Sequence, residues 1–371
     1  MRLLVRGSCI RHCRFSTSHR RLTDFIQAIT GVIGLAVARS LALRSGGSVI
    51  LRERNRAVGI ETSSRSSEVI HAGIYYGPGT LKTQLCIRGK KLLRIGKWIV
   101  AQNDAQRGTL EKLHALCWHV LDVPVNWISE AEMAALEPDV TATAGALESP
   151  TTGILDSHTP MMSLLADVED VGGTVALRSK AADASPLRDG AGWNLLVQGE
   201  DGQEITIRAV TVVNAAGLGA ALVHNLVLPP EQHIQMCYAK GNYFSYNAST
   251  PKVSRLIYPA PEPGHGGLGT HLTLDLAGRM RFGPDVEWCE GPDDVDVSPA
   301  KVPDAIREMR KYLPGIDATA LSPDYAGIRP KLSRDSAIEG IPGWVNLLAI
   351  ESPGLMSSLA IAEMVESLLY K

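Results

Sequence analysis

One residue with chemical potential, His71, follows a hydroxyl-rich stretch and lies between two apolar neighbours. The stretch runs from Glu61 to Ser67, and Ile70 and Ala72 flank the histidine. An imidazole with an unperturbed pKa of about 6.5 can take a proton near neutral pH. By itself the segment favours a structural histidine in the core, and the alternative is a general base.

A second candidate is the pair Arg329 and Lys331, which flank Pro330. Residues two apart in an extended segment point to the same side. A guanidinium can bind a carboxylate through two parallel hydrogen bonds, and an ammonium adds a point charge. The pair predicts a carboxylate-binding site, and the alternative is a solvated charged pair.

The third group is typical of nucleotide binding. Gly31 and Gly34 follow the apolar run 25–29, and Glu53 comes roughly 20 residues after them, a spacing typical of dinucleotide-binding units. Such glycines let the backbone approach a pyrophosphate, the helix N-terminus supplies N–H groups, and the carboxylate can accept ribose hydroxyls. The motif is incomplete, because Ile29 replaces its first glycine and a β-branched residue resists a positive φ.

Local patterns predict the elements that must position these residues. Residues 25–29 read as a buried strand, 35–44 as a helix and 48–51 as a second strand, the order of a dinucleotide-binding βαβ unit. A further apolar strand, 212–216, runs into the turn at Gly217. Residues 354–369 form an apolar-striped helix that follows Ser352-Pro353.

The composition narrows the class of protein. The 371 residues carry a net charge of −2 and 45% apolar side chains, with a pI of about 6.6, so no basic excess points to nucleic acid. The six cysteines form no C-x-x-C pair and no metal-ligand spacing with histidine, which favours reduced thiols and no metal site. The longest apolar stretch, 25–38, is too short for the roughly 20 residues of a membrane span.

Residues 1–23 differ from the rest of the chain. They are rich in arginine and serine and contain no acidic residue. This composition predicts a mitochondrial transit peptide, with a basic tail as the alternative.

Taken together, residues 61–76 and several later stretches resemble one family. It is the L-2-hydroxyglutarate dehydrogenase family, among the FAD-dependent oxidoreductases related to D-amino-acid oxidase. The matching stretches are 82–89, 96–101, 149–158, 212–219, 239–244, 255–263, 267–288, 325–333 and 350–360.

The resemblance implies an α/β chain, α+β overall. A glutathione-reductase-type FAD-binding Rossmann domain would be discontinuous, with an inserted substrate domain built on a mixed or antiparallel sheet. Residues 24–93, 150–220 and 325–371 would form the FAD-binding domain, and residues 94–149 and 221–324 the substrate domain.

The resemblance also implies residue roles. FAD would be the cofactor, His71 the base, and Arg329 and Lys331 the catalytic cations. Weaker substrate-pocket candidates are Tyr258, His271 and Lys240. The expected FAD contacts are Gly31, Gly34, Glu53, Arg54, Ser63, Ser64, Ala181, Gly217, Gly354, Leu355 and Ser357.

The activity implied is oxidation of L-2-hydroxyglutarate to 2-oxoglutarate, with hydride transfer to the flavin. The substrate would be a small 2-hydroxy dicarboxylic acid, and a quinone or an electron-transfer protein would accept the electrons. The protein would lie in the mitochondrial matrix or at the inner membrane. Two alternatives stay open: another 2-hydroxy or amino acid as substrate, or a diverged paralogue with impaired FAD binding.

Departures from the family pattern motivate the second alternative. Ile29 and Thr30 replace glycines, and Ala349 stands where a glycine is usual. The chain is also shorter than the family around residues 94–95 and 334–339. Misjudged exon boundaries and true divergence explain these differences equally well.

Overall fold

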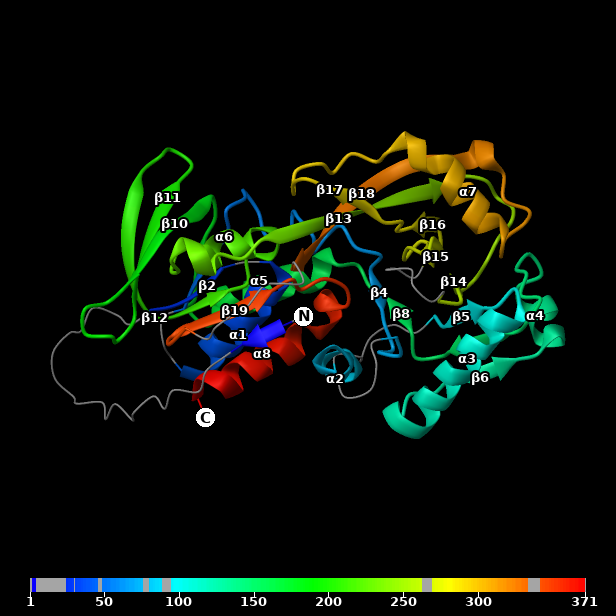
Figure 1. Cartoon of the computed structure of the whole chain (residues 1–371), viewed down its shortest axis with the longest axis horizontal. Helices are drawn as coiled ribbons and strands as arrows, with labels where there is room; N and C mark the ends of the chain where they lie inside the picture. Colours follow the sequence, from blue (N-terminus) through cyan, green and yellow to red (C-terminus); the bar gives the residue numbers. More distant parts are fainter. Residues whose placement is uncertain are drawn as a thin grey trace. The chain divides into compact units, whose positions relative to one another are not determined.

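The fold is that of a computed structural model of the chain (Figure 1). It describes residues 2–4, 25–29, 31–45, 49–75, 80–88, 95–261, 269–332 and 341–370. The chain divides into two compact units. Unit 1 comprises residues 1–64, 157–237 and 330–371, and unit 2 comprises residues 65–156 and 238–329. The domain bounds expected from the sequence stay a prediction, because compactness does not reveal which unit binds which molecule.

Within its described residues, unit 1 contains an eight-stranded mixed sheet. The central strands β19, β12, β2, β3 and β9 are parallel, β1 pairs antiparallel with β19, and β11 joins β10 to β12 in an antiparallel meander. The strands are β1 (Arg2–Leu4), β2 (Phe25–Ile29), β3 (Val49–Arg52), β9 (Thr174–Ala176), β10 (Ser179–Pro186), β11 (Trp193–Gly199), β12 (Glu204–Asn214) and β19 (Trp344–Leu348).

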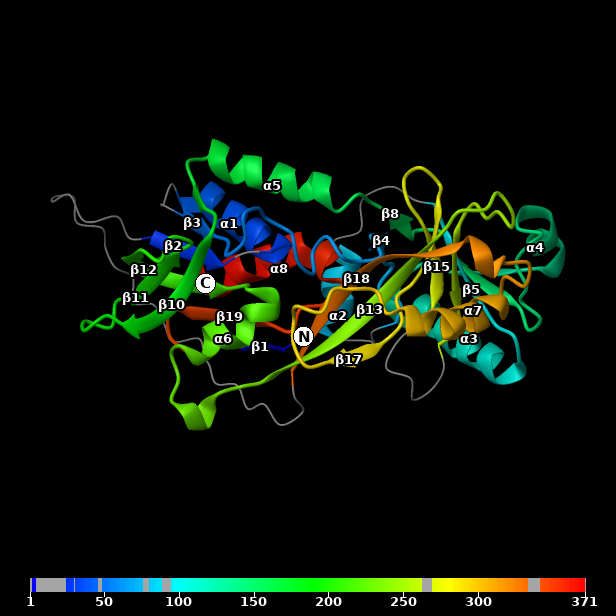
Figure 2. The same cartoon turned by 90° about the horizontal axis from the view of Figure 1, so that it is seen from above.

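Helix α1 packs against both α8 and α5, and the three lie side by side in Figures 1 and 2. Leu35, Ala38 and Leu41, at helical spacing within the predicted helix 35–44, are fully buried, whereas the apolar Leu43 is exposed. Helix α1 starts at Val32, three residues earlier than predicted, because the Gly31 carbonyl already accepts the Leu35 N–H at 3.0 Å. The helices are α1 (Val32–Ser45), α5 (His158–Asp170), α6 (Ala220–Asn225) and α8 (Gly354–Tyr370).

The described part of unit 2 is built on a nine-stranded sheet, largely antiparallel, in which β14 and β5 pair in parallel. A core of large side chains, including Trp98, Phe244 and Phe282, is completely buried. The strands are β5 (Lys97–Val100), β6 (Asn126–Ile128), β7 (Ala146–Ser149), β13 (Met236–Tyr246), β14 (Leu256–Pro259), β15 (His271–Leu274), β16 (Met280–Gly283), β17 (Glu287–Cys289) and β18 (Leu321–Leu332).

A two-stranded sheet, β4 (Val69–Ile70) with β8 (Gly153–Ile154), lies in the same unit. Its helices are α2 (Leu81–Arg88), α3 (Asp104–Leu116), α4 (Glu130–Leu136) and α7 (Val302–Arg310). The expected fold class is confirmed: a discontinuous unit with a parallel sheet flanked by helices, and a second unit with a mixed sheet.

Several features expected from the sequence lie outside the described residues. They include Thr30, residue 94, the shortened segment 334–339 and all of the predicted transit peptide except Arg2–Leu4. Within the predicted transit peptide, Arg2–Leu4 forms a strand that pairs with Asn346–Leu348. This pairing covers the otherwise open backbone edge of β19. Among the described helices, none combines the length and the apolar character that crossing a membrane requires.

Candidate active site

The turn between β2 and α1 centres on Gly31. Its φ of +122° is a conformation that L-residues rarely adopt, and this backbone angle explains the glycine, because an added Cβ would have room. Ile29, which replaces the first glycine of the motif, remains in extended β2, paired with Asn214 and Arg52. Among the described turn residues, the positive φ falls on Gly31 alone.

The N-terminus of α1 carries its own polar partner. The Val32 N–H donates to the Ser63 hydroxyl at 3.2 Å, and Gly34 is buried in the first helical turn. Ser64, next in the chain, donates instead to the Glu61 carbonyl at 3.4 Å. The structure therefore brings Ser63, but not the Ser64 hydroxyl, to the helix N-terminus.

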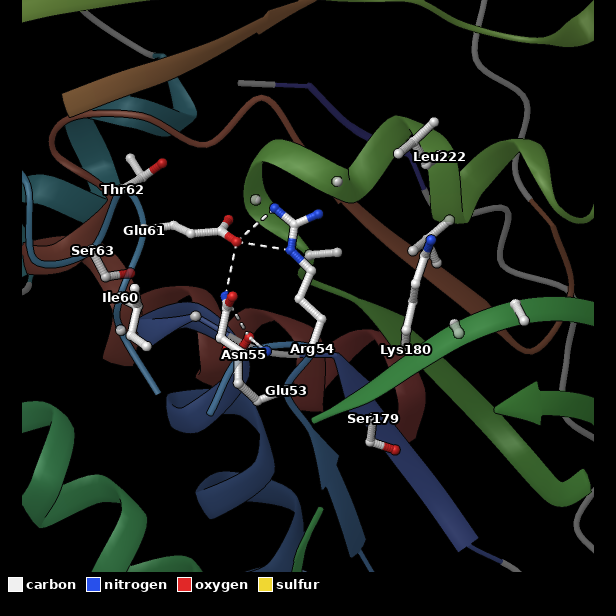
Figure 3. A pocket seen from close by; sticks show the side chains of 18 of the residues that line it. Glu53, Arg54, Asn55, Ile60, Glu61, Thr62, Ser63, Ser179, Lys180 and Leu222 are labelled. Atoms are coloured by element: carbon white, nitrogen blue, oxygen red, sulfur yellow. Dashed lines mark hydrogen bonds and ion pairs between the residues drawn. The ribbon is translucent and has the colours of Figure 1, made fainter. Parts of the chain in front are cut away.

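A polar network lies just beyond β3, where a ribose is expected (Figure 3). The carboxylate of Glu53, buried at 6% exposure, accepts hydrogen bonds from the Asn55 N–H at 2.8 Å and from Asn55 Nδ2 at 2.9 Å. Glu61 Oε1 accepts from Asn55 Nδ2 at 2.9 Å and from Arg54 Nε at 2.8 Å. Asn55 and Glu61 thus hold the side chains of Glu53 and Arg54 in place. The sequence analysis assigned no role to Asn55 or to Glu61.

These groups line a cavity of about 360 Å³ in unit 1. It opens where the parallel strands β2, β3 and β12 end, the edge at which open α/β sheets bind ligands. Gly217, which follows β12, has a φ of +52°, again a conformation that favours glycine. Six of the expected FAD contacts line this cavity, namely Gly31, Glu53, Arg54, Ser63, Ala181 and Gly217.

Three further expected contacts, Gly354, Leu355 and Ser357, lie at the start of α8, also in unit 1. A Cβ on Gly354 would come within 2.7 Å of Ile350 Cγ2, so this position accepts only glycine without rearrangement. Ser357 is buried, and its hydroxyl has no hydrogen-bond partner among the described residues. Ala349 has a φ of +51°, which explains why a glycine suits this position.

Unit 2 contains a group that we call the histidine–lysine cluster, consisting of His71, Tyr75, Lys97, Tyr258 and His271. The rings of Tyr258 and His271 stack with centroids 3.9 Å apart, and Lys97 Nζ lies over the rings of Tyr75 (4.4 Å) and Tyr258 (4.8 Å). Three separate segments supply the two tyrosines and the lysine: the chain after β4, strand β5 and strand β14.

Both histidines of the cluster are held neutral. Burial, and then the charge of Lys97 and the neighbouring His271, keep the pKa of His71 well below its usual value. Burial also lowers the pKa of His271 to about 3, although its hydrogen bond to the Gly269 carbonyl at 3.0 Å opposes this shift. A neutral imidazole has a lone pair that can accept a proton.

Lys97 was missed by the sequence analysis. Its side chain is fully buried, and burial lowers the pKa of its ammonium group to about 7. The only sequence signal is a charged residue at the head of the apolar run Trp98–Val100. The apolar pattern alone cannot distinguish such a buried lysine from one at the end of a strand whose ammonium group lies in solvent.

The predicted cations differ in their surroundings. Arg329 belongs to unit 2, where its Nη2 donates to the Asp285 carbonyl at 2.6 Å and its Nε to the Ala239 carbonyl at 3.4 Å. Backbone carbonyls therefore orient the guanidinium without neutralising it. Lys331 belongs to unit 1, and its Nζ donates to Glu351 Oε1 at 2.6 Å.

Lys240, a weaker candidate, already has carboxylate partners. Its buried Nζ lies 2.6 Å from Asp294 Oδ2 and 3.7 Å from Glu287 Oε1. Burial opposes its charge, but the hydrogen bond to Asp294 and the charge of Glu287 outweigh burial and raise its pKa. The structure thus provides a local partner for this ammonium.

The family model described as FAD dependent oxidoreductase matches residues 30–368, and the chain belongs to this family. It is an FAD-dependent oxidoreductase, and FAD is its cofactor. The unit 1 cavity fits that cofactor, because it combines glycines at positive φ, a helix N-terminus and a buried carboxylate beyond β3.

Individual relatives agree with this assignment. The chain is 36% identical to the mitochondrial L-2-hydroxyglutarate dehydrogenase of Arabidopsis thaliana, over 94% of this chain and 83% of the relative. It is 28% identical to the mitochondrial L-2-hydroxyglutarate dehydrogenase of Pongo abelii, over 92% of this chain and 86% of the relative.

Solved structures share the fold. The FAD-bound L-alpha-glycerophosphate oxidase of Mycoplasma pneumoniae superposes with a TM-score of 0.82 at 21% identity, covering 94% of this chain and 95% of the other. Glycine oxidase from Geobacillus kaustophilus gives a TM-score of 0.77 at 19% identity, with 94% of each chain covered.

Proposed function

We propose that this oxidoreductase oxidises L-2-hydroxyglutarate to 2-oxoglutarate in mitochondria. The observation that carries the proposal is the histidine–lysine cluster, where neutral imidazoles lie beside a buried cation. Oxidation of a hydroxy acid needs a base for the hydroxyl proton and cations for the carboxylates. The names of the Arabidopsis and Pongo relatives support this choice of substrate.

In this proposal His71 accepts the hydroxyl proton on its imidazole nitrogen. Burial and the charge of Lys97 keep that imidazole unprotonated before the reaction. Arg329 binds the carboxylate next to the reacting carbon, since backbone carbonyls preset its planar fork. His271 Nδ1 contacts the Gly269 carbonyl, which leaves Nε2 as an acceptor that can orient the hydroxyl.

Bound FAD would supply the two-electron acceptor for the hydrogen on the substrate carbon. We assign its binding to the expected contacts already located in unit 1. Glu53 would accept ribose hydroxyls, and the turn at Gly31 would let the pyrophosphate approach the α1 N-terminus. Ser64, Leu355 and Ser357 remain part of this proposal, as do Gly34 and Gly354. The weaker substrate candidates Tyr258 and Lys240, and the second cation Lys331, also stay proposals.

Anaerobic flavin bleaching tests the substrate. The FAD-loaded protein is mixed with L-2-hydroxyglutarate, its D-enantiomer, glycine and glycerol 3-phosphate while absorbance at about 450 nm is followed. We expect rapid reduction by L-2-hydroxyglutarate alone. Reduction by another of these compounds, with none by L-2-hydroxyglutarate, would contradict the proposal and indicate the alternative substrate class.

Mitochondrial targeting is tested separately. Residues 1–30 fused to a fluorescent protein should direct it to mitochondria, and replacing Arg2, Arg6, Arg11 and Arg14 by glutamine should abolish this targeting. A diffuse signal from the unmodified fusion would contradict the localisation. Quinones and electron-transfer proteins are the acceptors to assay with the reduced enzyme.

A further inference from the structure

Lys97 of the histidine–lysine cluster is a buried cation whose place in the fold needs an explanation. Its side chain has 0% exposure, and among the described residues no hydrogen-bond acceptor reaches its Nζ. The rings of Tyr75 and Tyr258 stabilise the charge through their faces, but a ring face does not replace an oxygen acceptor for three N–H donors.

Another buried lysine of the same unit, Lys240, gives a contrast, because the chain supplies it with carboxylate partners. Lys240 is 3% exposed, and two carboxylates from its own unit, Asp294 and Glu287, surround its Nζ. Lys97 is at least as buried and receives no such pairing among the residues described. Buried polar groups nearly always have partners, so Lys97 is expected to pair with an acceptor that the described residues do not supply.

A second cation lies near the same imidazole. The charges of Lys97 and Arg329 both lower the pKa of His271, after the larger effect of burial. Two cations around one neutral histidine match a substrate with a carboxylate at each end. Backbone carbonyls already orient the planar guanidinium of Arg329, so it suits the carboxylate next to the reacting carbon, whose angle must be controlled. A lysine supplies a point charge without a fixed plane and suits the remote carboxylate.

We propose that Lys97 binds the substrate carboxylate remote from the reacting carbon and thereby selects dicarboxylic over monocarboxylic 2-hydroxy acids. This specificity role rests on the proposed function, because the remote carboxylate belongs to the proposed substrate. No bond forms or breaks at Lys97. Its ammonium group holds the substrate and excludes molecules that leave it unpaired.

The first experiment uses the FAD-loaded Lys97→Met enzyme with L-2-hydroxyglutarate and L-2-hydroxypentanoate, which carries a methyl group in place of the remote carboxylate. We expect kcat/KM for the dicarboxylate to fall roughly 100-fold and that for the monocarboxylate to change less than about threefold. The matched control, Lys112→Met, removes an exposed charge from α3 and should change neither value.

Equal losses for both substrates, or no loss for either, would overturn the role of Lys97. Reduction of the wild-type flavin by L-2-hydroxyglutarate is measured first. Its absence would contradict the proposed function and this proposal together, whereas its presence with an unchanged Lys97→Met enzyme would overturn only the specificity role.

A second experiment needs no variant, in case Lys97→Met does not fold. Binding of glutarate and butyrate to the oxidised wild-type enzyme is followed through the flavin spectrum from about pH 6 to pH 9. Because the pKa of free Lys97 is about 7, glutarate binding must take up a proton above that pH. The glutarate Kd should then rise about tenfold per pH unit, while the butyrate Kd changes much less.

The groups facing Lys97 are His71, His271, Tyr75, Tyr258, Cys86 and Cys117. Both histidines have strongly lowered pKa values and stay neutral over this pH range. If the Kd values of glutarate and butyrate changed in parallel with pH, the proposal would be overturned, because the second carboxylate of glutarate would then not interact with a group that titrates in this range.

Discussion

In the cavity of unit 1 several polar groups have hydrogen-bond partners in the chain, whereas the described residues offer no such partner to two buried nitrogen atoms of the histidine–lysine cluster in unit 2. Asn55 satisfies Glu53, and Ser63 caps Val32. Lys97 Nζ and His271 Nε2 have no hydrogen-bond partner among the described residues. The cavity is thus preorganised by backbone and short-range contacts, while the unsatisfied groups of the cluster are consistent with the substrate site that we propose.

This difference predicts which property of the enzyme a substitution in each region should change. A change in the unit 1 cavity should alter cofactor affinity and stability, because it disturbs a network that exists without substrate. A change in the cluster should alter turnover while leaving cofactor content intact. The following predictions test this separation in order of decreasing effect.

The largest effect is expected from His71→Asn, which removes the proposed base. We predict that kcat/KM falls roughly 10²- to 10⁴-fold with an unchanged FAD content. Steady-state kinetics and the ratio of flavin to protein absorbance measure both quantities. His119→Asn, an exposed histidine of the same unit, is the control. Activity within about threefold of wild type would make His71 a structural residue.

The pH profile of the wild-type enzyme gives the next effect. Because the folded pKa of His71 is lowered well below its usual value, its neutral form is present above that lowered pKa and is lost as the pH falls through it. We predict that protonation of His71 lowers kcat/KM only below about pH 6.5, whereas the separate loss above about pH 7 comes from Lys97. A half-maximal loss on the acidic side at pH 6.5 or above would contradict an unprotonated buried base.

A smaller effect is expected at the turn of unit 1. Gly31→Ala places a side chain at a φ of +122°, which should cost on the order of 1–2 kcal/mol and weaken FAD binding about tenfold. Gly108→Ala, inside α3 with open space around its Cβ, should instead raise the Tm slightly. Flavin fluorescence on dilution measures the release of FAD. An unchanged affinity in Gly31→Ala would show that the turn tolerates a side chain.

The smallest effect is expected at Ala349, whose φ of +51° favours glycine. Ala349→Gly should stabilise the fold by up to about 1 kcal/mol, because relief of strain outweighs the added entropy of the unfolded chain. Ala134→Gly, exposed in the middle of α4, should destabilise by a similar amount. Thermal unfolding of both variants decides the sign, and a lower Tm for Ala349→Gly would contradict the strain.

The sequence was sufficient to predict the βαβ unit and the C-terminal helix of unit 1. The strands at 25–29 and 48–51, helix α1 and helix α8 follow from apolar periodicity and from glycines at element ends. The incomplete glycine motif is also compatible with the fold. Ile29 replaces its first glycine but lies in β2, and the unusual φ belongs to Gly31. These features depend on backbone geometry within a few residues, which local sequence determines.

The arrangement of the charged groups was not predictable in the same way. Arg329 and Lys331 form one motif in the sequence, but the structure gives Lys331 a carboxylate partner in Glu351 and orients Arg329 with the carbonyl of Asp285. Partners of this kind lie far away in the chain. Residue spacing cannot reveal whether a cation is already neutralised.

The sequence alone predicts the βαβ unit and its glycine turn, and it offers His71 as a candidate residue. Only the tertiary structure decided that Lys97 is buried between Tyr75 and Tyr258, near His271. The physical reason is that local conformation depends on neighbouring dihedral angles, whereas burial of a charge depends on which distant segments pack around it.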